Sequence, residues 1–212
     1  MRRIESLLPS DHGAQHFNRM YLRVTDAVRE AGDATLWEHE QFIPRLDVVF
    51  ANLYFQAVEQ FLRGDRVDPA WRPLFEERRG GRPLPIQFAL AGMNAHINHD
   101  LPVAVITACK EMDLEPHEHG PAHRDYTRTN DVLRGVESRI KDWFSEGFIA
   151  DIDHAMGKVD DVLAMWSIST AREIAWENAQ VLWLLGDHPG IELIYRRTLG
   201  RMVKFAGRGI LL

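Results

Sequence analysis

Apolar residues recur at spacings of three and four along most of this chain, and that period restricts the fold more than any other feature. In residues 11–31 the apolar positions are Phe17, Met20, Tyr21, Val24 and Val28. These positions fall on one face of a helix, whereas a half-buried strand would alternate with a period of two. No stretch alternates in this way, and the Asn-Gly and Asp-Gly signals of tight hairpins are absent. The chain is therefore predicted to be all-α.

Glycines, prolines and capping residues divide this pattern into about seven or eight helices. The candidate helices cover residues 11–31, 45–63, 85–100, 102–110, 121–144, 148–165, 171–185 and 191–205. Pro102 disfavours helix at Leu101, so the central helix is predicted to end near Asp100 and a new helix to begin at Pro102. The loop at 79–85 does not separate domains, because the helices before it have wide apolar faces that need partners. We expect residues 1–212 to form a single compact helical bundle.

The composition narrows the cellular context and the partners. The chain is 45% hydrophobic and 26% charged, as in an ordinary globular protein, and its net charge of −6 with no basic block argues against nucleic acid. The single Cys109 excludes an intramolecular disulfide framework and a multi-cysteine zinc site. No window approaches the ~20 apolar residues of a membrane span, and no signal peptide is recognised. We expect a cytoplasmic protein without a membrane partner, and the apolar C-terminus leaves a homo-oligomer open.

The central helix interrupts its apolar pattern with five polar side chains: Asn94, His96, Asn98, His99 and Asp100. Buried polar groups are costly unless they have partners, so this density needs an explanation. On a helix His96, His99 and Asp100 project from one face, and Gly92 one turn earlier leaves room beside His96. An imidazole and a carboxylate one turn apart can bind a divalent metal ion, or act as a base and the acid that orients it. They can also bond to each other in a closed structural network.

Residues elsewhere in the chain can complete this candidate site. Asp47 and Asp125 are candidate metal ligands beside His96 and Asp100, and such a His/Asp site would suit Mn, Fe, Mg or Zn. His99 is a candidate general base or additional ligand. Asn94 and Asn98 could bond to neighbouring helices. The residues expected to line a pocket for a small-molecule ligand are Asn94, Asn98, Tyr54, Arg172 and Trp176.

The adjacent pair His99-Asp100 resembles the hallmark of the all-helical HD-type phosphohydrolases. That resemblance would require His39 as an upstream ligand and Asp153 or Asp161 as a downstream one.

A broader resemblance covers most of the chain. The segments LDVVFANLYF at 46–55 and AGMNAHINHDLP at 91–102 resemble a bacterial family of unknown function that is frequent in actinomycetes. The resemblance implies an all-α domain with Gly-Met-Asn-Ala-His-Ile-Asn-x-Asp-Leu-Pro as its signature, in which position 99 varies. It therefore places His96 and Asp100 at the core of any shared site.

Three functions are compatible with these observations. The favoured prediction is a metal-dependent enzyme, a hydrolase of a small molecule, with His96, His99 and Asp100 as catalytic residues. The second is a metal-free lyase or cyclase in which the His–Asp pair transfers protons. The third is a non-enzymatic binding or scaffold protein in which these residues form a structural network. Serine-nucleophile and nucleotide-cofactor chemistry have no supporting motif.

Overall fold

The computed structural model describes residues 1–31, 37–76, 83–131, 133–134 and 167–212, and every regular element in these ranges is helical. The α-helices are α1 (Arg2–Leu7), α2 (Ala14–Ala31), α3 (Phe42–Arg63), α4 (Arg72–Glu76), α5 (Pro85–Ala95), α6 (Leu101–Glu111), α9 (Ile168–Leu184) and α10 (Pro189–Ile210). A further helix covers 121–131, a 3₁₀ turn covers Pro69–Trp71, and a π-helical turn, His96–Asp100, joins α5 to α6. The all-α prediction is confirmed. The predicted helix at 148–165 lies outside the described residues.

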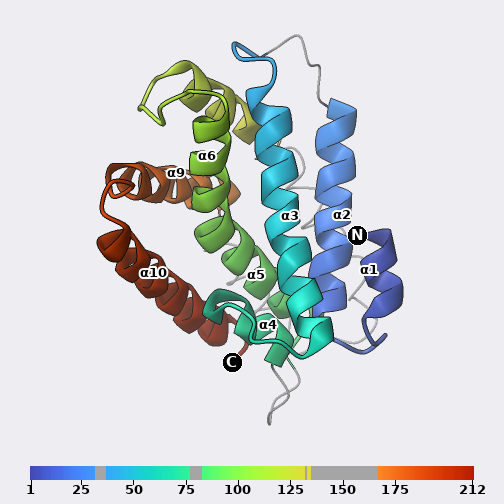
Figure 1. Ribbon diagram of the computed structural model, residues 1–212. Coiled ribbons are helices and arrows are strands. Elements are labelled where there is room, and N and C mark those ends of the chain that lie inside the picture. Colours follow the sequence, from blue (N-terminus) through green and yellow to red (C-terminus); the bar gives the residue numbers. More distant parts are fainter. Residues whose placement is uncertain (32–36, 77–82, 132, 135–166) are drawn as a thin grey trace.

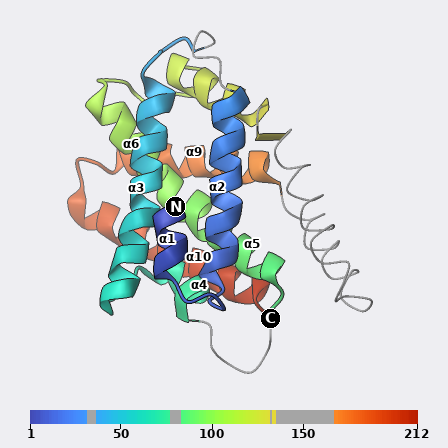
Figure 2. The ribbon, with the colours of Figure 1, turned by 90° about the vertical axis from the view of Figure 1, so that its right-hand side faces the viewer.

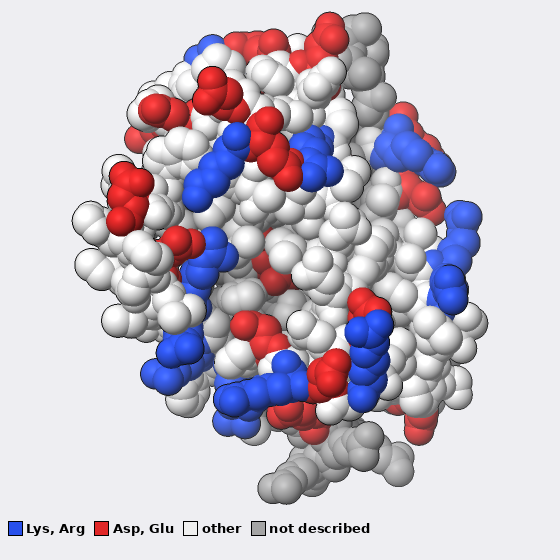
Figure 3. Space-filling model, in the orientation of Figure 1, with Lys and Arg blue, Asp and Glu red and all other residues white. Residues whose placement is uncertain are grey.

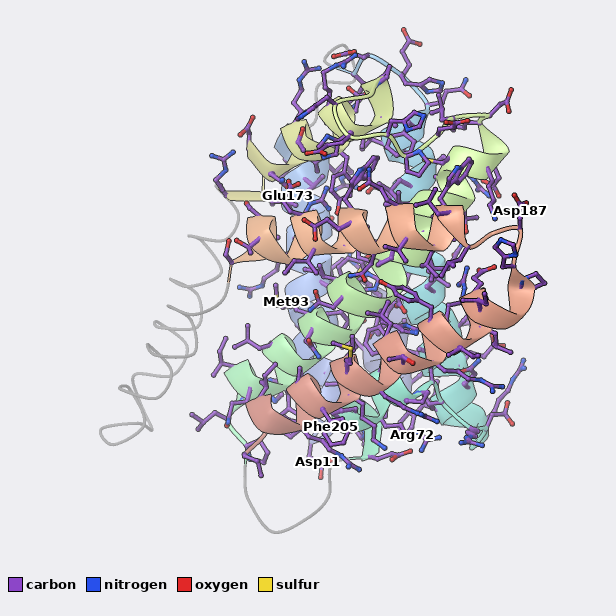
Figure 4. All side chains as sticks on the ribbon, turned by 90° about the vertical axis from the view of Figure 1, so that its left-hand side faces the viewer. Asp11, Arg72, Met93, Glu173, Asp187 and Phe205 are labelled. Atoms are coloured by element: carbon purple, nitrogen blue, oxygen red, sulfur yellow. The ribbon has the colours of Figure 1, made fainter. Side chains whose placement is uncertain are left out.

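The central helix, formed by α5, the π turn and α6, lies between two pairs of helices (Figure 1). On one side α2 packs against α5 and α3 packs against α6, and on the other α10 packs against α5 and α9 against α6. Figure 2 shows α2 and α3 side by side in front of the central helix. Figure 4 shows the opposite side, where α5, which carries Met93, is visible between α9 and α10. Helices on both sides explain why most central-helix residues are buried.

The helix break predicted at Pro102 is wrong, because the chain widens into a π turn and stays helical. The N–H of Leu101 donates to the carbonyl of His96, five residues earlier instead of four. Pro102 has no N–H, and in a regular α-helix its ring would press against the carbonyl of Asn98. A wider turn before the proline relieves this clash. The helix therefore runs without interruption from α5 into α6.

Aromatic side chains fill the space between the central helix, α2 and α3. Phe17, Tyr54 and Trp71 are fully buried, and the Phe17 ring meets the other two edge to face at 5.0 and 5.5 Å between centroids. A Cβ on Gly92 would lie 2.3 Å from Cγ of Phe17. The glycine therefore lets Phe17 approach the central helix, and this ring occupies the room predicted beside His96, 6.0 Å from the imidazole.

Helix α10 has glycines on its inner face and exposed apolar side chains on its outer face. Gly200 and Gly207 are buried, and a Cβ on Gly207 would lie 3.1 Å from Pro73. The exposed apolar side chains of its outer face follow helical spacing: Ile191, Ile194, Met202 and Phe205 (Phe205 is labelled in Figure 4). Figure 3 shows lysine and arginine side chains along the same helix at the lower left. None of the described helices is long and apolar enough to cross a membrane.

Candidate functional site

The carboxylate of Asp100 is the centre of a buried hydrogen-bond network. Nδ1 of His99 lies 2.8 Å from Oδ1, and Nδ1 of His96 lies 3.1 Å from Oδ2. The indole N–H of Trp71 donates to Oδ2 at 3.2 Å. Burial raises the pKa of Asp100, but the hydrogen bonds with His96 and His99 outweigh it and hold that pKa below its ordinary value. Asp100 is therefore an ionised acceptor that holds both imidazoles within the π turn.

His96 is a neutral imidazole with one unpartnered nitrogen. Burial lowers its pKa more than Asp100 raises it. Because Asp100 is ionised, Nδ1 of His96 carries the proton that it donates to the carboxylate, and Nε2 carries a lone pair. Nε2 is buried and has no hydrogen-bond partner among the described residues. Buried polar atoms are nearly always satisfied, so this nitrogen is an acceptor or base available to a ligand.

Aromatic rings enclose the imidazole of His96. The Phe50 ring is parallel to it with 3.5 Å between centroids, and the Tyr21 ring meets it edge to face at 4.7 Å. Three further rings have centroids within 6.1 Å of the imidazole: Phe17, Tyr54 and Trp71. Such an environment excludes water, which strengthens the interaction between His96 and Asp100.

His99 extends the network from Asp100 toward the surface. Its Nε2 lies 3.4 Å from Oδ1 of Asp68, whose side chain is 44% exposed. Burial lowers the pKa of His99, but the hydrogen bond to Asp100 and the charges of Asp100 and Asp68 raise it above its ordinary value overall. A chain of hydrogen-bonding groups therefore connects the buried base to solvent: His96, Asp100, His99 and Asp68.

A cavity of about 490 Å³ is lined by residues of α2, α3, the central helix and α9. His96 is part of its wall. Most of the other wall residues are apolar and include Met20, Tyr21, Val24, Ile43, Leu46, Phe50, Met93, Ile97 and Leu101. Pockets that hold small organic ligands have volumes of roughly 300–1,000 Å³ and mainly apolar walls with a few polar groups. The network is therefore placed beside a cavity with the size and lining of a ligand site.

Three charged side chains interrupt these apolar walls: Arg29 from α2, Asp47 from α3 and Arg172 from α9. Arg29 forms an ion pair with Asp26 at 3.2 Å. The side chain of Asp47 is exposed to solvent, although atoms of the cavity wall surround it. This partial enclosure raises its pKa to about 6, against the opposing effect of the Arg172 charge. Asp47 therefore presents an accessible carboxyl group to the interior of the cavity.

Asp125 is not brought to this cavity. Its two carboxylate oxygens accept the backbone N–H groups of Glu38 and His39, each at 2.8 Å. Asp125 therefore ties the helix at 121–131 to the segment that precedes α3, and its lone pairs are engaged there. A role as metal ligand beside His96 has no support in this placement.

Asn94 and Asn98 bond to neighbouring groups instead of lining the cavity. Asn94 donates from Nδ2 to the carbonyl of Val203 at 2.8 Å, and it accepts a hydrogen bond from Asn98 at 3.1 Å. The bond to Val203 fastens the central helix to α10, as expected for Asn94, whereas Asn98 bonds to a residue of the central helix itself.

Of the other three residues expected to line a pocket, only Arg172 does so. The Tyr54 hydroxyl donates to Oδ1 of Asn18 at 3.2 Å. Trp176 packs against the ring of Tyr126, with 4.8 Å between centroids. Both are core side chains that support the cavity walls from behind.

The donor atoms do not converge as a metal site requires. No group of three or more His, Cys, Asp or Glu side chains within the described ranges is placed to hold a metal ion. His39 precedes α3, whereas Asp68, which contacts His99, follows α3. His39 and the His99-Asp100 pair therefore lie near opposite ends of that helix. Asp153 and Asp161 lie outside the described residues. Metal binding stays a prediction that the geometry does not support.

Sequence reasoning missed Asp68 and Trp71 as members of the network. Asp68 caps the 3₁₀ turn by accepting the N–H of Ala70 at 2.9 Å, and the Asp-Pro dipeptide is a local signal for that cap. Nothing in the sequence links either residue to the central helix, because packing alone brings them together.

One comparison with known proteins gives a match. A protein-family model described as "Family of unknown function (DUF5995)" matches residues 1–212. No curated protein and no solved structure matches the chain significantly. The function of the cavity and of the hydrogen-bond network must therefore be inferred from the residues that form them.

Proposed function

We infer from the geometry of the site that this chain, which belongs to the DUF5995 family of unknown function, is a metal-free acid–base enzyme. It would act as a lyase or cyclase on a small, mainly apolar molecule. One observation carries the proposal. A buried, neutral His96 bonds to Asp100 through Nδ1, leaves Nε2 without a partner, and forms part of the wall of an apolar cavity. This arrangement is that of a general base held by an orienting carboxylate.

The residues of the site define the proposed proton transfer. Nε2 of His96 takes a proton from a C–H or O–H group of the ligand, and Asp100 stabilises the positive charge that develops on the imidazole. In an elimination, the electrons of the broken C–H bond form a double bond, the leaving group departs, and the imidazolium returns the proton to that group. In a ring closure, the deprotonated oxygen attacks an unsaturated carbon of the same ligand, and the imidazolium returns the proton to the atom that receives the displaced electron pair. A ligand reaches Nε2 when Tyr21 or Phe50 moves, since these half-buried rings contact His96 and also line the cavity.

The proposal is tested by deuterium exchange in metal-free buffer. Wild-type protein, freed of metal by chelation and checked by elemental analysis, is incubated in D₂O with a panel of apolar ketones and 2-oxo acids. ¹H NMR then follows exchange at the carbon next to the carbonyl group. We expect exchange that is lost in a folded His96→Gln variant and reduced in Asp100→Asn. Absence of exchange across the panel, or equal exchange in His96→Gln, contradicts the proposal.

Elemental analysis before chelation addresses the metal-dependent hydrolase that the sequence favoured. Stoichiometric metal in purified wild type that is absent from purified His96→Ala would support that function. A scaffold function predicts no exchange with any compound and a large loss of stability in His96→Ala. The three functions therefore give different results.

The outer face of α10 favours the homo-oligomer left open by the sequence, because four large apolar side chains are exposed on it, two on each side of the exposed Thr198. Light scattering of wild type and Phe205→Glu tests this part of the proposal. We expect a mass above that of one chain, reduced to one chain in the variant, and a monomeric wild type would contradict it.

A further inference from the structure

Arg172 is a buried cation whose direct partners are all uncharged. It is 7% exposed. Its Nε donates to Oδ1 of Asn130 at 2.6 Å, its Nη2 donates to the carbonyl of Tyr126 at 3.0 Å, and its guanidinium lies 4.1 Å from the centre of the Tyr126 ring. No carboxylate of the described residues forms an ion pair with it. A buried charge is costly without a counter-charge, so a bound anion would stabilise the guanidinium.

The position of Arg172 directs this charge toward the cavity. Both Arg172 and Ile168, the first residue of α9, line its wall. The amino end of a helix carries a partial positive charge, which adds to that of the guanidinium. The side chain and the helix end therefore produce a positive region at one part of the cavity, apart from Arg29, whose charge is paired with Asp26.

Asp47 does not neutralise this region. It lines the same cavity and interacts with Arg172 through space, but the two form no ion pair, and burial keeps the pKa of Asp47 above its ordinary value. Asp47 therefore lowers the positive potential at the guanidinium without occupying its N–H donors. Three of the five guanidinium N–H groups have no acceptor among the described residues, which leaves donors for a carboxylate.

We propose that the cavity binds an apolar organic acid, whose carboxylate pairs with Arg172 while its hydrocarbon part lies against the apolar walls and reaches His96. This proposal deepens the proposed function, on which it rests, by naming the class of substrate. The carboxylate fixes the orientation of the ligand, and the reacting carbon lies along the hydrocarbon part, away from the anchored end.

Calorimetric titration with three probes of equal chain length tests the proposal: decanoate, decanol and decyltrimethylammonium. We expect decanoate to bind at least about tenfold more tightly than decanol, as charge-assisted hydrogen bonds imply, and the cation to bind more weakly than either. Arg172→Gln removes the preference for decanoate, and Arg172→Lys retains part of it. Equal affinities for decanoate and decanol in wild type overturn the proposal.

Arg172 also fastens α9 to the helix at 121–131, so a second variant leaves its contacts intact. Asp47→Asn removes the opposing negative charge and is expected to tighten decanoate binding several-fold without changing the affinity for decanol. Unchanged decanoate binding in this variant contradicts the assignment of Arg172 as the anchor.

The two proposals fail in different ways. His96→Gln removes the base but keeps Arg172, so it should bind decanoate like wild type while losing deuterium exchange. Decanoate binding without exchange in wild type overturns only the proposed reaction. Exchange of neutral ketones without a preference for acids overturns only the organic acid as substrate.

Discussion

Replacement of Asp100 by asparagine keeps the shape of the side chain and removes its charge. In the wild type, Oδ1 and Oδ2 accept hydrogen bonds from His99 at 2.8 Å and from His96 at 3.1 Å. Asparagine has one acceptor oxygen and an NH₂ group that only donates, so one imidazole loses its acceptor. His99 also loses the stronger of its two negative neighbours, and its pKa falls toward the ordinary value.

The expected loss of stability follows from these contacts. A hydrogen bond to a charged group contributes about 1.5–3 kcal/mol, and a buried donor left unpaired costs about 1–3 kcal/mol more. Removing a buried carboxylate offsets part of this loss, because its desolvation is itself costly. We expect Asp100→Asn to lower the free energy of unfolding by about 2–4 kcal/mol.

The loss should depend on pH with a defined sign. The pKa of Asp100 is lowered by folding, so its contribution is complete above about 3.9 and disappears as the pH falls through its folded pKa. The pKa of His99 is raised, so its contribution is complete below about 6.5 and disappears as the pH rises through its folded pKa. The difference between wild type and variant is therefore largest between about pH 4 and 6.5.

Urea denaturation followed by circular dichroism, repeated from pH 4 to 8, measures this difference. Asp68→Asn is the matched control, because asparagine retains the cap on the 3₁₀ turn and the exposed carboxylate contributes less than about 1 kcal/mol. If Asp100→Asn costs less than about 1 kcal/mol at every pH, the network does not hold Asp100 as an ionised acceptor, and the reasoning is refuted.

Three further substitutions or reactions test other parts of the structure. Asp47→Asn should raise the free energy of unfolding by about 1 kcal/mol at pH 8, a small effect because water in the cavity screens the charge. The variant should also remove the loss of stability that accompanies ionisation of Asp47 as the pH rises toward 6. Unchanged urea midpoints would contradict both expectations. Gly92→Ala should cost about 1–3 kcal/mol, because its Cβ would overlap Phe17. Gly190→Ala, whose Cβ meets nothing within 4 Å, is the neutral control in the same thermal melts. Cys109 is buried and burial raises its pKa to about 12, so a thiol reagent at pH 8 should label it only after unfolding, and rapid labelling of native protein would disprove its burial.

Helical periodicity in the sequence was enough to predict the principal helices. The predicted range 45–63 corresponds to Phe42–Arg63 and the range 171–185 to Ile168–Leu184. These helices carry enough turns for an apolar face to be recognised. Helix α1 was not predicted, because its six residues bury only Ile4 and show no period.

The candidate site was predictable only where its residues are close in sequence. Spacing by four placed His96 and Asp100 on one face, and the structure brings them into contact. The Asp100 partner Trp71 comes from 29 residues earlier, and only packing places it there. Asp125 was misjudged for the same reason, since the N–H groups that it accepts lie 86 and 87 residues away. Local patterns identify a polar helix face but not the residues that meet it.

The π turn at His96–Asp100 has a consequence for how such a site can arise. A turn closed over five residues instead of four contains one residue more than a regular helix needs. Insertion of a single codon into the gene for a straight helix would create it, and deletion of one codon would remove it. Because the wide turn accommodates the additional residue, α5 and α6 would keep about the same relative orientation after the deletion, and α6 would keep its packing against α3 and α9. The site can therefore be gained or lost in one mutational step while the bundle persists.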